Sequence, residues 1–249
     1  MEQPIFFIIG AQRCGTTFLY NQLEAHPEIS MSTPVKPEPK YFLNDQEVNK
    51  GKQFYLEKYF GNLTQEKVIG EKSTSYIEYP ESGRKILNYF PNAKFIVVLR
   101  NPMDRAISNY KFSRENGIET RKLKEVFIDR IAIPELAQKN LSVSPFDYLE
   151  RGNYLQYLDK YEKVIGKGRL KIVFFEKLTS DIKYLQKIYS ELGVSGSYCP
   201  PNFRKKANAT EQSTSIGELE EVRECLRKHF EPINSRLAES YNLELEIWK

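Results

Sequence analysis

Apolar residues in this chain gather into short runs, and the segments between the runs repeat apolar positions at helical spacing. Four runs are predicted strands: Ile5–Ile9, Val68–Glu71, Phe95–Leu99 and Leu170–Phe175. In the intervening segments apolar residues recur every three or four positions, the period of a helix with one buried face. Strands that alternate with helices build βα units around a mainly parallel sheet. The pattern therefore predicts an α/β fold.

Several predicted helices have recognisable ends. The first is expected over about Thr16–Ala25, just before a His-Pro pair. A later helix begins where Asn101 can act as the N-cap and Pro102 suits the first helical position. Gly193 is typical of a helix C-terminus, and Pro232 is expected to end the last helix. No internal repeat or long linker interrupts the 249 residues, so we expect one domain over residues 1–249.

The strongest chemical signal is the run Gly10–Thr17, which follows the first predicted strand and opens the first helix. A glycine-bounded turn at this place presents successive backbone N–H groups, and the helix N-terminus adds to their positive potential. Such a turn favours an anion. Its two glycines have the spacing of the nucleotide-binding loop GxxxxGK[ST]. We therefore expect a P-loop-like three-layer sandwich, with a central, mainly parallel sheet flanked by helices.

This turn departs from the loop of metal-dependent nucleotide hydrolases. Thr16 occupies the position of the lysine, and the cation of the turn is Arg13 instead. The strand Phe95–Leu99 is followed by Arg100, where such enzymes have an acidic residue that helps to hold Mg²⁺. We therefore expect a guanidinium and backbone N–H groups to neutralise the anion without a metal. A phosphosulfate suits such a site better than a triphosphate does.

A second anion site is predicted after the strand Phe95–Leu99. Arg100 follows the carboxyl end of this strand, and Ser108 lies about two turns into the next helix. A guanidinium and a hydroxyl in these positions can hold one phosphate by charge-assisted hydrogen bonds. An arginine at a strand end is more often part of a surface ion pair. The presence of two such sites on successive βα units makes that alternative less favoured.

Together these motifs resemble those of sulfotransferases that use 3′-phosphoadenosine 5′-phosphosulfate (PAPS). Gly10–Thr17 resembles their 5′-phosphosulfate loop, and Arg100–Tyr110 is similar to their 3′-phosphate motif. Lys36–Phe42 and Gly70–Ser73 resemble the carbohydrate branch, which is related to heparan sulfate sulfotransferases. The resemblance is firm over roughly the first 115 residues and weaker beyond them. Each motif is weak alone, whereas their order and spacing together are specific.

The resemblance implies metal-free, in-line transfer of a sulfuryl group from PAPS to a hydroxyl or amine, with release of adenosine 3′,5′-bisphosphate. Arg13 stands where many relatives carry a catalytic lysine. Because arginine does not readily donate a proton, we expect it to stabilise charge on the leaving oxygen. Lys72 is expected to be a second cation near that oxygen or near the acceptor. The rest of the donor cradle is expected to come from Cys14, Gly15, Thr16 and Thr17.

Glu38 matches the general base of the family, which takes the proton of the acceptor. Prolines on both sides restrict its backbone to extended conformations. The alternative is a solvated surface glutamate in a charged loop. We expect Tyr41 and Phe42 to anchor this loop on the core rather than to contact substrate.

A late basic cluster lies at the place where relatives have a basic loop that closes over the 3′-phosphate and the adenine. The cluster consists of Arg204, Lys205 and Lys206. A solvated run of charge is an equally good interpretation of these residues. The pattern does not indicate which of the three contacts the nucleotide.

The composition excludes several other classes of function. A net charge of +4 is too weak to predict binding to nucleic acid or a membrane, and no run approaches the roughly 18 apolar residues of a membrane span. Three scattered cysteines and two histidines do not predict a disulfide framework or a metal site. We expect a cytoplasmic protein whose acceptor is a sugar or a small metabolite. The sequence does not indicate an oligomeric state.

Two rival functions use the same fold. A P-loop kinase or hydrolase with a degenerate loop is disfavoured by Thr16 and Arg100. A catalytically silent nucleotide-binding protein is disfavoured because residues for the donor and for the acceptor side are both present.

Overall fold

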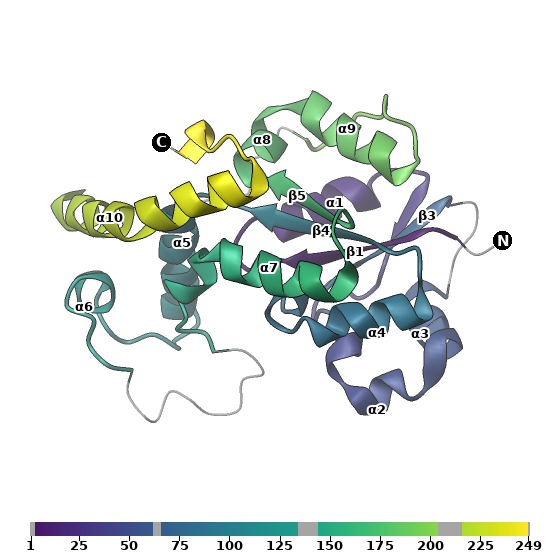
Figure 1. The fold of residues 1–249 in the computed structure, drawn as a ribbon, viewed down its shortest axis with the longest axis horizontal. Coiled ribbons are helices and arrows are strands. Elements are labelled where there is room, and N and C mark those ends of the chain that lie inside the picture. The colour runs from purple at the N-terminus through teal and green to yellow at the C-terminus, as the bar shows by residue number, and fades with distance from the viewer. Residues whose placement is uncertain (1–2, 62–65, 134–143, 204–215, 249) are drawn as a thin grey trace. The chain divides into compact units, whose positions relative to one another are not determined.

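The computed structural model describes residues 3–61, 66–133, 144–203 and 216–248 (Figure 1). Contacts divide the chain into two compact units. The first unit comprises Met1–Leu99 and Tyr157–Ala207, and the second comprises Arg100–Gln156 and Asn208–Lys249. A single domain over residues 1–249 stays a prediction.

A five-stranded sheet forms the centre of the first unit. Its strands lie in the order β2-β3-β1-β4-β5, and each adjacent pair is parallel. Their bounds are β1 (Ile5–Gly10), β2 (Ile29–Met31), β3 (Val68–Lys72), β4 (Lys94–Leu99) and β5 (Leu170–Phe174). The four predicted strands are confirmed to within one residue. Strand β2 has only three residues, too few for its apolar pattern to predict it.

Helices cover both faces of this sheet. Figure 1 shows α1 and α9 along one face, with α4 and α7 along the other, so the predicted three-layer α/β sandwich is confirmed. The helices of this unit are α1 (Thr16–Glu24), α2 (Asp45–Val48), α3 (Gly51–Phe60), α4 (Glu81–Tyr89), α8 (Phe175–Ser180) and α9 (Ile182–Leu192). Most of α7 (Tyr154–Ile165) also belongs to the first unit. The short 3₁₀ turns of this unit are η1 (Tyr41–Leu43) and η2 (Tyr76–Glu78). Gly193 adopts a left-handed conformation at the end of α9, as predicted.

Aromatic side chains fill the layer between the sheet and one set of helices. Phe7 of β1 contacts the rings of Phe42 and Phe95, with centroids 5.8 and 6.1 Å away. Tyr41 and Phe42 are fully buried, so the prediction that they anchor their loop on the core is confirmed. Tyr55 of α3 is buried against both of them. These five aromatic residues therefore belong to the core.

The second unit is helical. It contains α5 (Pro102–Glu115), α6 (Leu123–Phe127), α10 (Ile216–Tyr241) and the 3₁₀ turns η4 (Glu150–Gly152) and η5 (Glu246–Trp248). Helix α5 starts as predicted, because the side chain of Asn101 accepts a hydrogen bond from Met103 N and Pro102 is the first helical residue. The core of the second unit is formed by residues that include Ala106, Ile107, Tyr110, Phe127, Val222, Leu226 and Phe230.

Helix α10 corrects one sequence prediction, because it continues through Pro232 to Tyr241. A proline inside a helix costs about 3 kcal/mol. Leu237, beyond the proline, is fully buried, and Ile233 packs against the core of the unit. The burial of Phe230 before Pro232 and of Leu237 after it offsets that cost.

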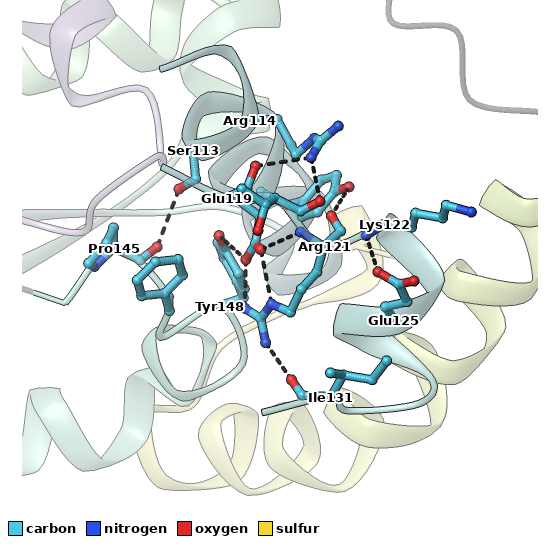
Figure 2. A network of polar contacts seen from close by, with 12 residues as sticks. Ser113, Arg114, Glu119, Arg121, Lys122, Glu125, Ile131, Pro145 and Tyr148 are labelled. Carbon is cyan, nitrogen blue, oxygen red and sulfur yellow. Dashed lines mark hydrogen bonds and ion pairs between the residues drawn. The ribbon is translucent and has the colours of Figure 1, made fainter. Parts of the chain in front are cut away.

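A buried carboxylate holds the segment between α5 and α6, as Figure 2 shows. Glu119 accepts hydrogen bonds from the backbone N, Nε and Nη2 of Arg121 at 2.9, 2.9 and 2.6 Å, and from Tyr148 OH at 3.0 Å. Arg121 also donates to the carbonyl of Ile131. Burial acts to raise the pKa of Glu119, but the hydrogen bonds from Arg121 and Tyr148 lower it overall. The Glu119–Arg121 ion pair therefore holds the segment between α5 and α6, and each of the two charges is balanced by the other.

Candidate functional site

A glycine-bounded turn joins β1 to α1, as the sequence predicts. Ala11 N donates to Val98 O at 2.9 Å, which fixes the turn to the neighbouring strand β4. Arg13 and Gly15 have positive φ values of 66° and 81°, and Gly15 is the N-cap residue of α1. The first amides of a helix have no carbonyl acceptor within that helix. The start of α1 therefore offers the backbone donors that the sequence predicts.

Close packing explains both glycines of this turn. An ideal Cβ on Gly15 would lie 2.1 Å from the ring of Phe175, the first residue of α8. A Cβ on Gly10 would lie 2.7 Å from the side chain of Ile77 in η2. Any side chain at either position would displace the turn or its neighbour. The glycine spacing that suggested a phosphate loop is therefore required by this local fold.

The side chains of the turn differ in their exposure. Arg13 and Thr17 are exposed, whereas Cys14 and Thr16 are buried. The thiol of Cys14 lies 3.7 Å from the carbonyl oxygen of Gln12. This arrangement agrees with Cys14 as a small structural residue of the loop and with Arg13 as its exposed cation.

Glu38 is engaged in a polar cluster with Lys72 and Thr74. Lys72 Nζ lies 2.5 Å from Glu38 Oε1, and Thr74 N donates to Glu38 Oε2 at 2.9 Å. The hydroxyl of Thr74 lies 3.1 and 2.9 Å from the two carboxylate oxygens. The side chain of Glu38 is 17% exposed and that of Lys72 only 3%. Glu38 is therefore not a solvated surface glutamate.

The sheet places this cluster beside the turn. Lys72 is the last residue of β3 and pairs in register with Ile8 of β1. The next residue, Ser73, donates its N–H to Ile8 O at 3.0 Å, and its hydroxyl accepts from Lys40 N at 2.8 Å. The carbonyl oxygen of Thr74 is 3.4 Å from an ideal Cβ on Gly10. Because parallel strands end at one edge of the sheet, the cluster and the turn share that edge.

A second contact ties the turn to the segment after β3. Gln12 Nε2 donates to Glu78 Oε1 of η2 at 2.9 Å. Sequence reasoning missed Gln12 and Thr74, although Thr74 directly follows the segment Gly70–Ser73. Gln12 contacts Glu78 and Thr74 contacts Glu38, and in each contact the two residues lie far apart in the chain. The only sequence signals were the place of Gln12 within the run Gly10–Thr17 and that of Thr74 directly after Gly70–Ser73.

A buried glutamate lies beneath the cluster. Tyr55 OH and Ser73 Oγ each donate to the carboxylate of Glu71 at 2.6 Å. Burial raises the pKa of Glu71, while the hydrogen bonds from Ser73 and Tyr55 act in the opposite direction. Ser73 also accepts the hydrogen bond from Lys40 N, so Glu71 supports the loop that carries Glu38.

The residues of the predicted second anion site lie in the second unit. Arg100 is the residue after β4 and is half-buried, and its carbonyl oxygen accepts a hydrogen bond from Tyr154 OH at 2.8 Å. Ser108 is half-buried in α5. The three basic residues Arg204, Lys205 and Lys206 lie outside the described residues.

Among the residues that the structure describes, no group of three or more His, Cys, Asp or Glu side chains is arranged to hold a metal ion. No helix within the described parts of the chain is both long enough and apolar enough to cross a bilayer.

A family model described as "Sulfotransferase domain" matches residues 3–199. This chain belongs to the sulfotransferase family. The match covers the turn Gly10–Thr17, the Glu38–Lys72 cluster and the segment from Arg100 to Ser108. The recognition made from the motifs is therefore confirmed.

Curated members of the sulfotransferase family show similar sequences. Bifunctional heparan sulfate N-deacetylase/N-sulfotransferase 4 of Mus musculus is 29% identical over 201 residues, 78% of this chain. Membrane-associated sulfotransferase kil1 of Dictyostelium discoideum is 37% identical over 112 residues, 44% of this chain. The match spans only 23% of the length of each relative.

Solved sulfotransferase structures share the fold. A sulfotransferase from Alicyclobacillus acidocaldarius is 26% identical, with a TM-score of 0.77 over 100% of this chain and 99% of the other. A sulfotransferase domain from the curacin biosynthetic pathway is 13% identical, with a TM-score of 0.51 over 96% of this chain and 98% of the other. The second similarity shows the fold alone.

Proposed function

We propose that this protein transfers a sulfuryl group from PAPS to a hydroxyl or amine of an acceptor, without a metal ion. The observation that carries the proposal is the carboxylate of Glu38, held by Lys72 and Thr74 at the sheet edge where the turn begins. A carboxylate and a buried ammonium beside an anion-binding turn supply a base and a cation for one transfer reaction.

In the proposed reaction the acceptor oxygen or nitrogen attacks the sulfur atom. The bond from sulfur to the bridging phosphate oxygen breaks, and its electron pair leaves with adenosine 3′,5′-bisphosphate. Glu38 takes the proton of the acceptor. Arg13 stabilises the negative charge that develops on the leaving oxygen, and Lys72 supplies a second positive charge.

The donor is held at two ends in this proposal. The amides of Cys14 and Gly15 and the residues Thr16 and Thr17 bind the 5′-phosphosulfate. Arg100 and Ser108 bind the 3′-phosphate, which is the role of the family motif that Arg100–Tyr110 resembles. A contribution from Arg204, Lys205 or Lys206 belongs to the same proposal and rests on the same resemblance.

We propose a carbohydrate as the acceptor, with a small metabolite as the alternative. The proposal draws on the relatives named for heparan sulfate N-sulfotransfer and on the Lys36–Phe42 segment. Acceptor loops vary on a shared scaffold, so the fold alone does not select between an alcohol and an amine.

The test is transfer of labelled sulfate from PAPS in the presence of EDTA. Three acceptors are compared: a glucosamine–uronic acid oligosaccharide with free amines, its N-acetylated form and a small alcohol. We expect labelled product with at least one oligosaccharide and undiminished activity in EDTA. Magnesium-dependent hydrolysis of ATP, with no transfer from PAPS, would establish the P-loop kinase or hydrolase alternative instead. Tight binding of adenosine 3′,5′-bisphosphate with no transfer to any acceptor would indicate a silent nucleotide-binding protein.

A further inference from the structure

The turn η5 is attached to the start of the Arg100–Ser108 segment through Asn101. The side chain of Asn101 uses both ends of its amide. Its Oδ1 accepts from Met103 N at 3.0 Å and caps α5, while its Nδ2 donates to the carbonyl oxygen of Trp248 at 2.8 Å. Because the cap requires the oxygen to face α5, the NH₂ group is left to face Trp248.

A second connection runs through Tyr154. Its ring packs against that of Trp248, with centroids 6.0 Å apart, and its hydroxyl donates to Arg100 O at 2.8 Å. Trp248 is 6% exposed and Tyr154 is 1% exposed. Two consecutive residues, Arg100 and Asn101, are therefore held by a buried pair of aromatic residues, one of them from η5.

We propose that η5 is a positioning element for donor binding, and that Trp248 and Tyr154 fix the backbone at Arg100 so that its guanidinium meets the 3′-phosphate. This inference rests on the proposed function, which assigns the 3′-phosphate to Arg100 and Ser108. Asn101 couples the two residues, because it follows Arg100 and caps the helix that carries Ser108. Arg100 is a binding residue in this proposal, and Trp248, Tyr154 and Asn101 act through it.

The expected effect on the 3′-phosphate comes from the geometry of the Arg100 guanidinium rather than from its charge. A charge-assisted hydrogen bond to phosphate is strong only when the guanidinium is directed at the phosphate oxygens. A backbone that moves at Arg100 spreads the guanidinium over many positions, and binding must then order it at an entropic cost. This cost applies only to ligands that carry a 3′-phosphate. The 5′ end of the donor is bound by a different segment, Gly10–Thr17.

The test compares two nucleotides that differ at the 3′ position. Affinities for adenosine 3′,5′-bisphosphate and for adenosine 5′-monophosphate, which lacks only the 3′-phosphate, are measured by calorimetry. The variants are Tyr154→Phe, which removes only the hydroxyl, Trp248→Ala, and Asn101→Ser. Serine keeps a capping oxygen but has no amide to reach Trp248. We expect each variant to bind the bisphosphate about tenfold more weakly, because a guanidinium that is no longer held in place loses about one charge-assisted hydrogen bond to the 3′-phosphate. Binding of the 5′-monophosphate should stay as in wild type.

Matched variants separate positioning from folding. Trp248→Phe keeps an aromatic ring against Tyr154 and is expected to retain most of the affinity for the bisphosphate. Thermal unfolding of each variant is recorded beside the binding data. An equal loss of affinity for both nucleotides would show general loosening and overturn the inference.

The same measurements distinguish this inference from the proposed function. If wild type prefers the bisphosphate and all three variants keep that preference, the role of η5 is wrong while the proposed function stands. If wild type itself binds both nucleotides equally, the assignment of the 3′-phosphate to Arg100 and Ser108 fails, and the inference fails with it.

Discussion

Lys72 Nζ lies 2.5 Å from Glu38 Oε1, and this pair joins the last residue of β3 to a loop 34 residues earlier in the chain. Removing a lysine from water is costly unless its charge is paired. Glu38 supplies the pairing, and Thr74 supplies hydrogen bonds to the remaining carboxylate positions. The pair therefore fixes the loop and also places a carboxylate beside a cation.

Replacement of the proposed base tests its role directly. We expect Glu38→Gln to lower kcat by about 100-fold or more, because a glutamine cannot accept the acceptor proton. The affinity for adenosine 3′,5′-bisphosphate should stay within about twofold of wild type, since the proposal assigns nucleotide binding to other residues. The measurement is steady-state kinetics together with calorimetry. Glu57→Gln, on the exposed face of α3, is the control. Full activity of Glu38→Gln would contradict the assignment.

Thr74 is predicted to position Glu38. Thr74→Val removes the hydroxyl but keeps the shape and the backbone N–H, so we expect kcat to fall by about tenfold. Thr74→Ser restores the hydroxyl and should recover most of that loss. In a Glu38→Gln background, Thr74→Val should have little further effect, because the two residues act as one unit. Independent, additive losses would show that Thr74 acts elsewhere.

Gly15 is predicted to tolerate no side chain. Gly15→Ala meets both a positive φ and the ring of Phe175, and we expect a loss of about 2 kcal/mol in the free energy of unfolding, together with weaker nucleotide binding. Gly193→Ala is the matched control, since Gly193 also has a positive φ but nothing within 4 Å of the added Cβ. Urea unfolding of both variants separates backbone strain from the clash. Equal losses would show that Phe175 moves aside at no cost.

Glu71 gives a pH dependence of stability with a defined sign. Burial raises the pKa of Glu71 in the folded state, so its carboxyl binds a proton more tightly there than in the unfolded chain. The contribution of Glu71 to stability is fully present below its pKa in the unfolded chain. It is lost as the pH rises through its pKa in the folded state. We therefore expect the stability of wild type relative to Glu71→Gln to decrease as the pH is raised from about 4 towards neutrality. Urea unfolding at several pH values measures this difference, and a rising difference would contradict the assignment.

Glu119 gives a pH dependence of stability with the opposite sign. Despite its burial, the hydrogen bonds from Arg121 and Tyr148 lower the pKa of Glu119 below that of the unfolded chain. Its contribution is therefore present above the unfolded pKa and is lost as the pH falls through the folded pKa. Arg121→Ala leaves this carboxylate buried without its ion pair, and we expect a loss of about 3 kcal/mol at neutral pH that shrinks in acid. Urea unfolding at neutral and acid pH is the measurement. A loss that is independent of pH would assign the effect to packing alone.

The strands and the turn could be predicted because their signals are local. A short apolar run such as Phe95–Leu99 predicts a buried strand from its own residues alone. Gly15 indicates a turn because glycine readily adopts a positive φ. Strand β2 was missed because three residues carry too little pattern. The end of α10 was predicted wrongly at Pro232 because the burial of Leu237 depends on the rest of its unit.

The sequence by itself determined the α/β class, the glycine-bounded turn after the first strand and the family, since each depends on the type and order of neighbouring residues. Only the tertiary structure decided that Glu38 lies in a partly buried ion pair rather than in solvent, and that Asn101 and Tyr154 connect Arg100 to Trp248. The physical reason is that the exposure of a side chain and its hydrogen-bond partners depend on the groups that pack around it. Those groups come from segments that the chain order does not place together.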